Sequence, residues 1–364
     1  MKKRHKGKFF YVFLIYKLSE HTYQIREIHY SLCYNEVSIY TKNVMRELVT
    51  MKEKVVVIVG PTAVGKTSFS IEVAKESNGE VISGDSMQVY KHLDIGTAKV
   101  TPEEMDAIPH HLIDFKEVDE SYTVSDFQED GDSKIQKILK RNRVPIVVGG
   151  TGLYVESLLY PVSHGEDAEP NQELRDELEQ FAVENGNEVL WNRLDKIDPK
   201  AAEKIHPNNV RRVVRALEVF NETGKLFSTF QNERKNKEPK YDALIIGLNT
   251  DRELLYERIN KRVDKMMDEG LLDEARQLWE KLGPNSEAQS TKAIGYGELF
   301  QYFNGDISLE EATRLIKRNS RRYAKRQLTW FRNRFKNVHW IDLILEPENK
   351  NSCLNEVKRF LEDE

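Results

Sequence analysis

The sequence predicts an α/β protein with a parallel sheet at its core, an α-helical insertion and basic C-terminal helices. Short β-branched runs alternate with helical patterns, which is typical of a parallel sheet covered by helices on both faces. Between residues 161 and 240 the strand signals stop, and the pattern is charged and helical. After residue 248 long helical patterns take over, and the last of them is rich in Lys and Arg.

The composition supports a folded protein and narrows its class. Of the 364 residues, 39% are hydrophobic and 32% are charged, a balance that argues against a largely disordered chain. No apolar run approaches the roughly 20 residues that a membrane span needs, so we expect no integral membrane protein. Cys33 and Cys353 are too few for a disulfide framework or a four-cysteine zinc site. We therefore expect a cytoplasmic protein. No pattern indicates an obligate oligomer, so we expect a monomer.

The chain is expected to have four parts. Residues 1–50 open with a basic start and a short apolar run, but no signal-peptide cleavage site follows. We interpret them as an extension or a misassigned start, with Met51 as the natural first residue; a genuine, poorly ordered arm is the alternative. The remaining parts are an α/β core with its C-terminal helices (51–160 and 241–340), a helical insertion domain (161–240) and a C-terminal tail (341–364).

Four strands are predicted in the core, at residues 55–59, 81–82, 144–148 and 241–248. The first is a β-branched run, which is typical of a buried parallel strand. Helical spacing runs from Lys66 to Lys75. The chain therefore passes from the first strand to a helix through one short loop.

That loop matches the phosphate-binding pattern G-x-x-x-x-G-K-[ST]. Glycines let the backbone approach a phosphate, and N–H groups at the start of the helix point at it. Lys66 supplies a charge for the terminal phosphates, and the Thr67 hydroxyl is the expected Mg²⁺ contact. The pattern predicts a P-loop NTPase-like core that binds a di- or triphosphate, and it does not distinguish ATP from other ligands. The loop residues are Gly60, Pro61, Thr62, Ala63, Val64, Gly65, Lys66 and Thr67.

A carboxylate follows the second predicted strand. Asp85 falls at the C-terminal end of that strand, where ligands bind in parallel sheets. It could hold Mg²⁺ through water, or take a proton from a nucleophile beside the phosphates. A helix N-cap is the structural alternative, because Asp favours that position.

The last long helical pattern is strongly basic. Between Arg314 and Lys336 there are ten Lys or Arg residues and no Asp or Glu, in a chain whose net charge is −5. Such polarisation indicates a polyanionic partner. The interleaved aromatic residues suit RNA, whose bases can stack on them. A solvated basic face with a buried aromatic stripe is the alternative, and both can hold together. The aromatic residues are Tyr323, Trp330, Phe331 and Phe335.

Taken together, the motifs resemble those of the bacterial tRNA dimethylallyltransferases, also called tRNA isopentenyltransferases. The resemblance covers nearly all of residues 53–340. Besides the phosphate loop, it is carried by GDSMQVY (84–90), DIGTAK (94–99), PHHL (109–112), VGGTGLY (148–154), HPNN (206–209), AIGY (293–296) and YAKRQLTW (323–330).

The resemblance implies transfer of a dimethylallyl group from dimethylallyl diphosphate to N6 of the adenosine 3′-adjacent to the anticodon in tRNA. The phosphate loop would then hold a diphosphate leaving group, with Mg²⁺ as cofactor. Asp85 matches the family's general base, Thr62 a threonine that contacts the donor, and Arg262 an arginine near the diphosphate. The positions matching the family's tRNA contacts are Asp85, Ser86, Met87, Gln88, Thr151, Arg175, Arg211, Arg212, Val213, Val214, Arg215, Lys292, Ala293, Ile294, Gly295, Tyr296 and Gly297.

Two positions depart from the family's pattern. The family usually has Gln or Arg where Lys292 stands, and Lys or Arg where Gly297 stands. Gly297 lacks a long cation, which weakens the match there.

Three other functions stay open from the residues alone. They are a P-loop kinase of a small metabolite, an adenylate dimethylallyltransferase acting on free AMP or ADP, and a non-catalytic RNA-binding NTPase switch. The basic C-terminal helices argue against the first two. The third leaves Asp85 without a proton to accept.

Overall fold

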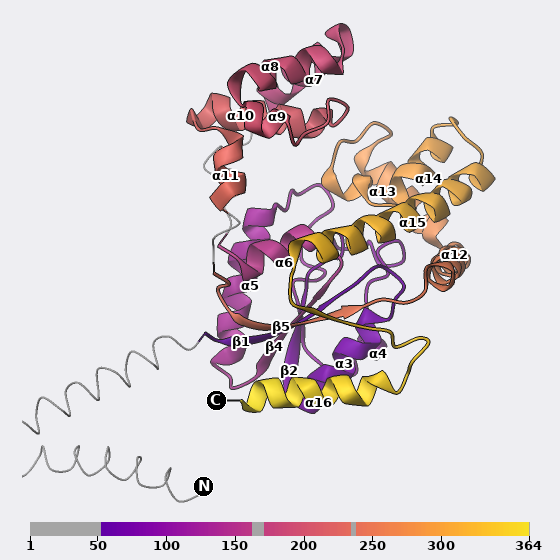
Figure 1. Ribbon diagram of the computed structural model, residues 1–364. Coiled ribbons are helices and arrows are strands. Elements are labelled where there is room, and N and C mark those ends of the chain that lie inside the picture. The colour runs from indigo at the N-terminus through magenta and orange to yellow at the C-terminus, as the bar shows by residue number, and fades with distance from the viewer. Residues whose placement is uncertain (1–51, 162–170, 234–237, 364) are drawn as a thin grey trace, which may run out of the picture. The chain divides into compact units, whose positions relative to one another are not determined.

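The computed structural model describes residues 52–161, 171–233 and 238–363 (Figure 1). Residues Glu53–Glu364 form one compact unit. The expectation for residues 1–50 lies outside the described residues. In the described part of the chain, no helix is both long and apolar enough to cross a membrane.

The core is a six-stranded sheet in the order β3-β2-β4-β1-β5-β6, and every pair of neighbours is parallel. The four predicted strands are confirmed, and the sequence missed two. The strand β3 is only two residues long, and β6 is a short His- and Trp-containing segment after a basic helix, so neither has a strong strand pattern. The strands are β1 (Lys54–Val59), β2 (Gly79–Ser83), β3 (His110–His111), β4 (Val144–Gly149), β5 (Asp242–Leu248) and β6 (Val338–Ile341).

Helices cover both faces of the sheet. In the core they are α3 (Lys66–Ser77), α4 (Pro102–Met105), α5 (Val124–Leu139), α6 (Gly152–Leu159), α12 (Arg252–Asp268), α13 (Leu271–Leu282), α14 (Tyr296–Phe303), α15 (Leu309–Arg334), α16 (Asn349–Glu362) and the 3₁₀ helix η2 (Gln289–Lys292). In the insertion they are α7 (Gln172–Asn185), α8 (Asn187–Ile197), α9 (Pro199–Ala202), α10 (Val210–Thr223) and α11 (Phe227–Glu233).

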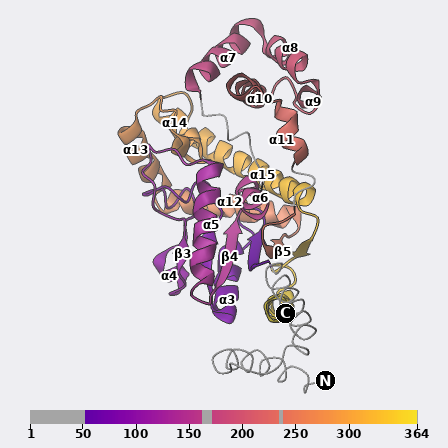
Figure 2. The same ribbon diagram turned by 90° about the vertical axis from the view of Figure 1, so that its left-hand side faces the viewer.

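Strand β1 is buried on both sides, as its β-branched sequence predicts. Val55, Val57 and Val59 point into a cluster shared with α5 and α6, whereas Val56 and Ile58 point into a second cluster shared with α3, α12 and α16. This alternation follows from the two-residue period of a strand. Figure 2 shows α5 in front of the sheet.

The carboxyl ends of β1, β2 and β4 lie side by side, because β4 pairs with both of the others. At this edge the chain of β2 passes very close to that of β4: a Cβ on Gly149 would lie 2.2 Å from the Gly84 carbonyl oxygen. Glycine is required there. The loops that follow β1, β2 and β4 are thereby gathered at one edge, where ligands bind in open parallel sheets.

The insertion has a hydrophobic cluster of its own. Within the described residues its regular secondary structure is helical, as predicted, and the helices bury Leu178, Leu190, Leu194, Val213 and Leu217 together. The amphipathic pattern of α10 explains this packing, since its apolar positions recur at helical spacing.

The segment 341–364, expected to be a tail, instead contains the end of β6 and helix α16. On α16, Cys353 and Val357 are buried in the cluster that also contains residues of α3. The segment therefore completes one face of the sheet.

Candidate active site

A cavity of about 320 Å³ lies at the carboxyl edge of the sheet. Its walls come from the loops after β1 and β2, the start of α3, the end of β4, helices α12, α13 and α15, and residues 292–294 just before α14. They bring together residues more than 200 positions apart in the sequence: Thr62, Lys66, Thr67, Asp85, Ser86, Met87, Gln88, Gly96, Thr97, Ala98, Val148, Gly149, Gly150, Ile259, Arg262, Val263, Met266, Leu271, Lys292, Ala293, Ile294, Ile316, Ser320, Tyr323, Arg326 and Gln327.

The phosphate loop has the predicted strand–loop–helix setting. Helix α3 begins at Lys66, directly after Gly65, whose φ of 102° suits glycine. Lys66 Nζ donates hydrogen bonds to the carbonyl oxygens of Gly60 (3.0 Å) and Pro61 (2.8 Å). The Pro61, Ala63 and Val64 side chains are buried, and of the loop residues only Thr62, Lys66 and Thr67 are among the described residues that line the cavity.

Asp85 stands where the sequence places it, just beyond the end of β2, and it lines the cavity. Its Oδ1 accepts a hydrogen bond from the Met87 N–H at 2.9 Å. Burial raises the pKa of this carboxyl, against the opposing effects of the Met87 N–H and the Lys66 ammonium. Asp85 is therefore a better base than an exposed aspartate.

Lys66 is shifted by the same burial in the opposite direction. Burial lowers the pKa of its ammonium to about 8, although Asp85 acts to raise it and Arg262 lowers it further. At neutral pH the Lys66 ammonium therefore keeps most of its charge, and it lines the same cavity as the Asp85 carboxyl group.

Arg262 reaches the phosphate loop from α12. Its Nη1 donates to Thr62 Oγ1 at 3.5 Å, and one turn earlier Arg258 Nε donates to the Ala63 carbonyl at 3.0 Å. Burial lowers the pKa of the Arg262 guanidinium, which nevertheless keeps its charge near neutrality. The three residues expected at the chemistry, Asp85, Thr62 and Arg262, all line the cavity.

Ser86, Met87 and Gln88 also line the cavity, whereas Thr151 supports them from behind. Thr151 Oγ1 accepts a hydrogen bond from the Ser86 N–H at 3.1 Å. Thr151 precedes α6, so it fixes the loop after β2 against the start of that helix.

The predicted RNA-contact segment 292–297 divides between cavity and core. Lys292, Ala293 and Ile294 line the cavity, while Tyr296 is fully buried. Lys292 also pairs with Glu287 at 3.0 Å. Gly297 has no side chain, so any contact at this position falls to its backbone.

The insertion residues expected to contact RNA are not among the described residues that line the cavity. Arg175 and Arg215 both bind Glu218, at 2.7 Å each, and this carboxylate has no solvent exposure. Arg211 is exposed and Arg212 is half-buried.

Val213 and Val214 require a correction. Their side chains are buried in the hydrophobic cluster of the insertion, because they occupy the apolar face of α10. They can support the neighbouring arginines, but their side chains are not available to an RNA.

The basic helix α15 contributes directly to the cavity, through Ile316, Ser320, Tyr323, Arg326 and Gln327. Sequence reasoning assigned no role to Gln327. Its Oε1 accepts from the Thr62 N–H at 2.9 Å, and its Nε2 donates to the Gly150 carbonyl at 3.1 Å. The sequence feature that could have indicated this role is the presence of an amide side chain in a helix rich in Lys and Arg.

The expectation of base-stacking aromatic residues on α15 is wrong for two of the four. Phe331 and Phe335 are buried in the core, and Trp330 packs against the same cluster. A Cβ on Gly152 would lie 2.2 Å from the Trp330 ring. The alternative, a solvated basic face over a buried aromatic stripe, describes these residues.

The cavity is lined by oxygen atoms of the kinds that can coordinate a magnesium ion. The Thr67 hydroxyl and the Asp85 carboxylate line it together, and Mg²⁺ prefers oxygen ligands. Within the described ranges no group of three or more His, Cys, Asp or Glu residues could hold a metal. An ion here would therefore take most of its ligands from substrate phosphate and water, as Mg²⁺ commonly does.

Fold and site together define an α/β enzyme of the P-loop class that acts on a phosphorylated substrate. The profile of the "IPP transferase" family matches residues 88–334. The tRNA dimethylallyltransferase of Enterococcus faecalis is 52% identical over 311 residues, covering 85% of this chain and 98% of that protein. That of Halalkalibacterium halodurans is 53% identical over 293 residues, covering 80% and 92%.

Solved structures agree. The full-length tRNA isopentenylpyrophosphate transferase from Bacillus halodurans superposes with a TM-score of 0.64 at 50% identity, covering 86% of this chain and 98% of that one. A eukaryotic dimethylallyltransferase acting on tRNA gives a TM-score of 0.72 at 35% identity, covering 84% and 78%. The chain belongs to the IPP transferase family, and the two relatives compared above are tRNA dimethylallyltransferases.

Proposed function

We propose that this protein transfers the dimethylallyl group of dimethylallyl diphosphate to N6 of the adenosine 3′-adjacent to the anticodon in tRNA. The observation that carries the proposal is the shared cavity of Asp85 and the phosphate loop. A base there can meet a nucleophile directly beside a bound diphosphate.

The cavity offers complementary surfaces to the two ends of the donor. Lys66, Arg262 and the N–H groups at the start of α3 form a cationic end for the diphosphate. The side chains at the other surface are apolar and suit a five-carbon prenyl group. They are Val263, Met266, Leu271, Ile294 and Ile316.

In the transfer step the N6–C1 bond forms while the bond from C1 to the diphosphate oxygen breaks. The diphosphate leaves with the electron pair, and the N6 proton goes to the Asp85 carboxylate. Lys66, Arg262 and the loop amides stabilise the charge that develops on the leaving diphosphate, which is the largest expected catalytic effect.

We propose that the Thr67 hydroxyl would help to hold Mg²⁺ beside the diphosphate. When bound, the ion neutralises phosphate charge. The contact between Arg262 and Thr62 orients the phosphate loop for the diphosphate.

The RNA is expected to lie over the cavity mouth, against exposed cations of α15 and the arginines of α10. Arg322, Lys325 and Arg326 are exposed on α15, and Arg211 is exposed on α10. These cations suit phosphate contacts. One chain supplies every group in this proposal, so a monomer suffices.

One assay separates the candidate functions. The protein is incubated with labelled dimethylallyl diphosphate and either tRNA, AMP or ATP, and the labelled product is identified. We expect label only on tRNA, at one adenosine. Label on AMP would make the protein an adenylate dimethylallyltransferase. Hydrolysis or transfer of ATP phosphate without prenyl transfer would favour a kinase or an NTPase switch.

A further inference from the structure

Part of the cavity wall is a loop that is neither helix nor strand. Gly96, Thr97 and Ala98 line the cavity, and the chain from 93 to 99 forms a turn flanked by residues without regular structure. A wall of this kind keeps its shape only if other groups satisfy its backbone and hold it in place.

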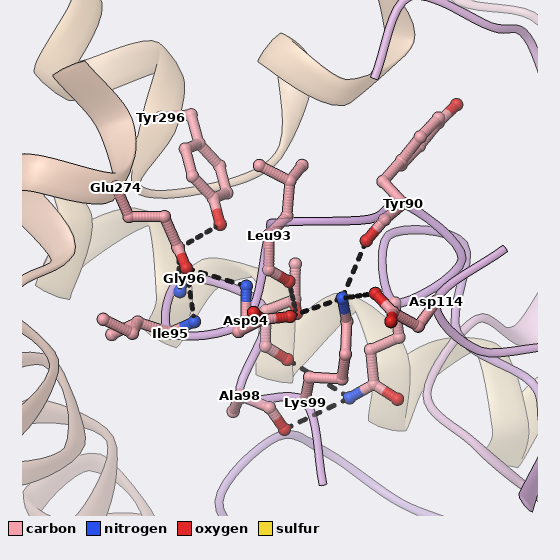
Figure 3. Close-up of polar contacts among 12 residues, drawn as sticks. Tyr90, Leu93, Asp94, Ile95, Gly96, Ala98, Lys99, Asp114, Glu274 and Tyr296 are labelled. Carbon is pink, nitrogen blue, oxygen red and sulfur yellow. Dashed lines mark hydrogen bonds and ion pairs between the residues drawn. The ribbon is translucent and has the colours of Figure 1, made fainter. Parts of the chain in front are cut away.

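Glu274 of α13 holds this loop. Its Oε2 accepts the backbone N–H groups of Asp94 (2.8 Å) and Ile95 (2.9 Å), and its Oε1 accepts that of Gly96 (2.9 Å). The Tyr296 hydroxyl donates to Oε1 at 2.6 Å (Figure 3). One carboxylate therefore accepts four hydrogen bonds, and bonds to a charged acceptor are the strong kind.

The groups around these hydrogen bonds are closely packed. Tyr296 is fully buried, and a Cβ on Gly96 would lie 2.6 Å from the Tyr296 ring. The buried phenol has a pKa well above its ordinary value, because of burial and the adjacent Glu274. It therefore remains a hydrogen-bond donor throughout the working pH range.

The other side of the loop is tied as well. Lys99 Nζ donates to the Tyr90 carbonyl at 2.8 Å and pairs with Asp94 at 2.6 Å and Asp114 at 2.7 Å (Figure 3). Gln88 Nε2 donates to the carbonyl of Ala98 at 3.3 Å. These bonds anchor the loop to the segment after β2, whereas Glu274 is the group that anchors it to α13 and α14.

Glu274 thus joins three pieces of the cavity wall. Two belong to the apolar surface: Leu271, one turn earlier on α13, and Ile294, two residues before Tyr296. The third is Gly96 of the loop, which supports that surface from the side. We propose that Glu274 is a positioning residue that fixes this apolar surface and thereby limits the size of the prenyl donor. The proposal rests on the proposed function.

The test compares two donors with tRNA as acceptor. Values of kcat/KM are measured for dimethylallyl diphosphate and for geranyl diphosphate, which is one isoprene unit longer. In Glu274→Gln the amide nitrogen cannot accept hydrogen bonds, so the loop loses about half of its anchor. We expect the preference for the shorter donor to fall by about tenfold or more, because the loss of even one hydrogen bond to a charged group corresponds to a factor of that size.

Glu280→Gln is the matched control, because Glu280 is exposed on the same helix and the charge change is identical. It should leave both kcat/KM values unchanged. If both donors slow by the same factor in Glu274→Gln, the residue is only structural and the proposal is wrong.

Should Glu274→Gln fail to fold, Tyr296→Phe removes one of the four bonds and leaves the carboxylate. The preference should then fall in the same direction by a smaller factor, and an unchanged preference would overturn the proposal. A wild-type protein that transfers neither prenyl group to tRNA would contradict the proposed function, and this proposal with it.

Discussion

Burial in one cavity shifts the pKa values of Asp85 and Lys66 in opposite directions. Burial favours the neutral form of both, so it raises the pKa of the carboxyl and lowers that of the ammonium. Their mutual attraction works against both shifts. The result is a carboxyl group with raised proton affinity next to an ammonium that keeps most of its charge at neutral pH.

Replacing Asp85 with Asn should abolish most transfer while leaving donor binding intact. The amide keeps the shape of the side chain but cannot accept the N6 proton. Loss of a general base typically costs about 10²–10⁴-fold. Single-turnover rates and donor binding by calorimetry measure the two effects separately. Near-normal turnover would remove Asp85 from the mechanism.

The rate should depend on pH through both groups. The carboxylate is protonated as pH falls through the raised pKa of Asp85, and the ammonium is deprotonated as pH rises through about 8, the pKa of Lys66. Donor kcat/KM should therefore decline above about pH 8. In Lys66→Arg that decline should move upward, because a guanidinium stays protonated there. A decline near pH 8 that persists in Lys66→Arg would show that Lys66 is not its cause.

Helix α15 joins the core to the phosphate loop through one side chain. Gln327 is buried and bridges the Thr62 N–H and the Gly150 carbonyl. Gln327→Leu leaves both backbone groups without this partner, so the free energy of unfolding should fall by about 2 kcal/mol or more. Denaturant unfolding measures the loss. Asn333→Leu, at an exposed position of the same helix, should change it little; equal losses would deny Gln327 a special role.

The exposed cations of α15 should make tRNA binding depend on salt. Arg321 is left unchanged because it donates to Asn260 at 2.5 Å, whereas Arg322 and Lys325 are exposed. Changing both exposed residues to Gln should flatten the log–log salt slope by about 0.7–0.9 for each phosphate that is no longer neutralised.

The matched control for this prediction lies on α16, which packs against α3. Lys350 and Lys358 there pair with Glu72 and Glu76. The double change of these lysines to Gln should leave the slope as it is. An unchanged slope in the α15 variant would assign Arg322 and Lys325 to a solvated face.

At the scale of the whole molecule, local sequence patterns were enough to predict four of the six strands and the phosphate loop. The reason is that β1 and the start of α3 are determined mainly by residues that are neighbours in the sequence. The position of Asp85 followed from the same logic. Gln327 and Glu274 could not be predicted, since each acts on backbone more than 170 residues away. The burial of Phe331 was equally a matter of tertiary packing.

The enclosed position of Asp85 in the cavity also constrains the shape of the acceptor. An adenine stacked in a helix cannot place N6 inside the cavity beside Asp85, so the base must turn out of its stack. This costs a few kcal/mol and is easiest in a single-stranded loop. We therefore expect an anticodon stem-loop to be a sufficient acceptor without the rest of the tRNA.

The most direct measurement compares initial rates of dimethylallyl transfer to two RNAs at one salt concentration. One is an isolated anticodon stem-loop, and the other contains the same bases annealed into a continuous duplex. Mass spectrometry of the digested RNA identifies the modified adenosine. We predict modification of the stem-loop at the adenosine 3′ of the anticodon and essentially none in the duplex. Equal rates on both RNAs, or an unmodified stem-loop, would contradict transfer to a base turned out into this cavity.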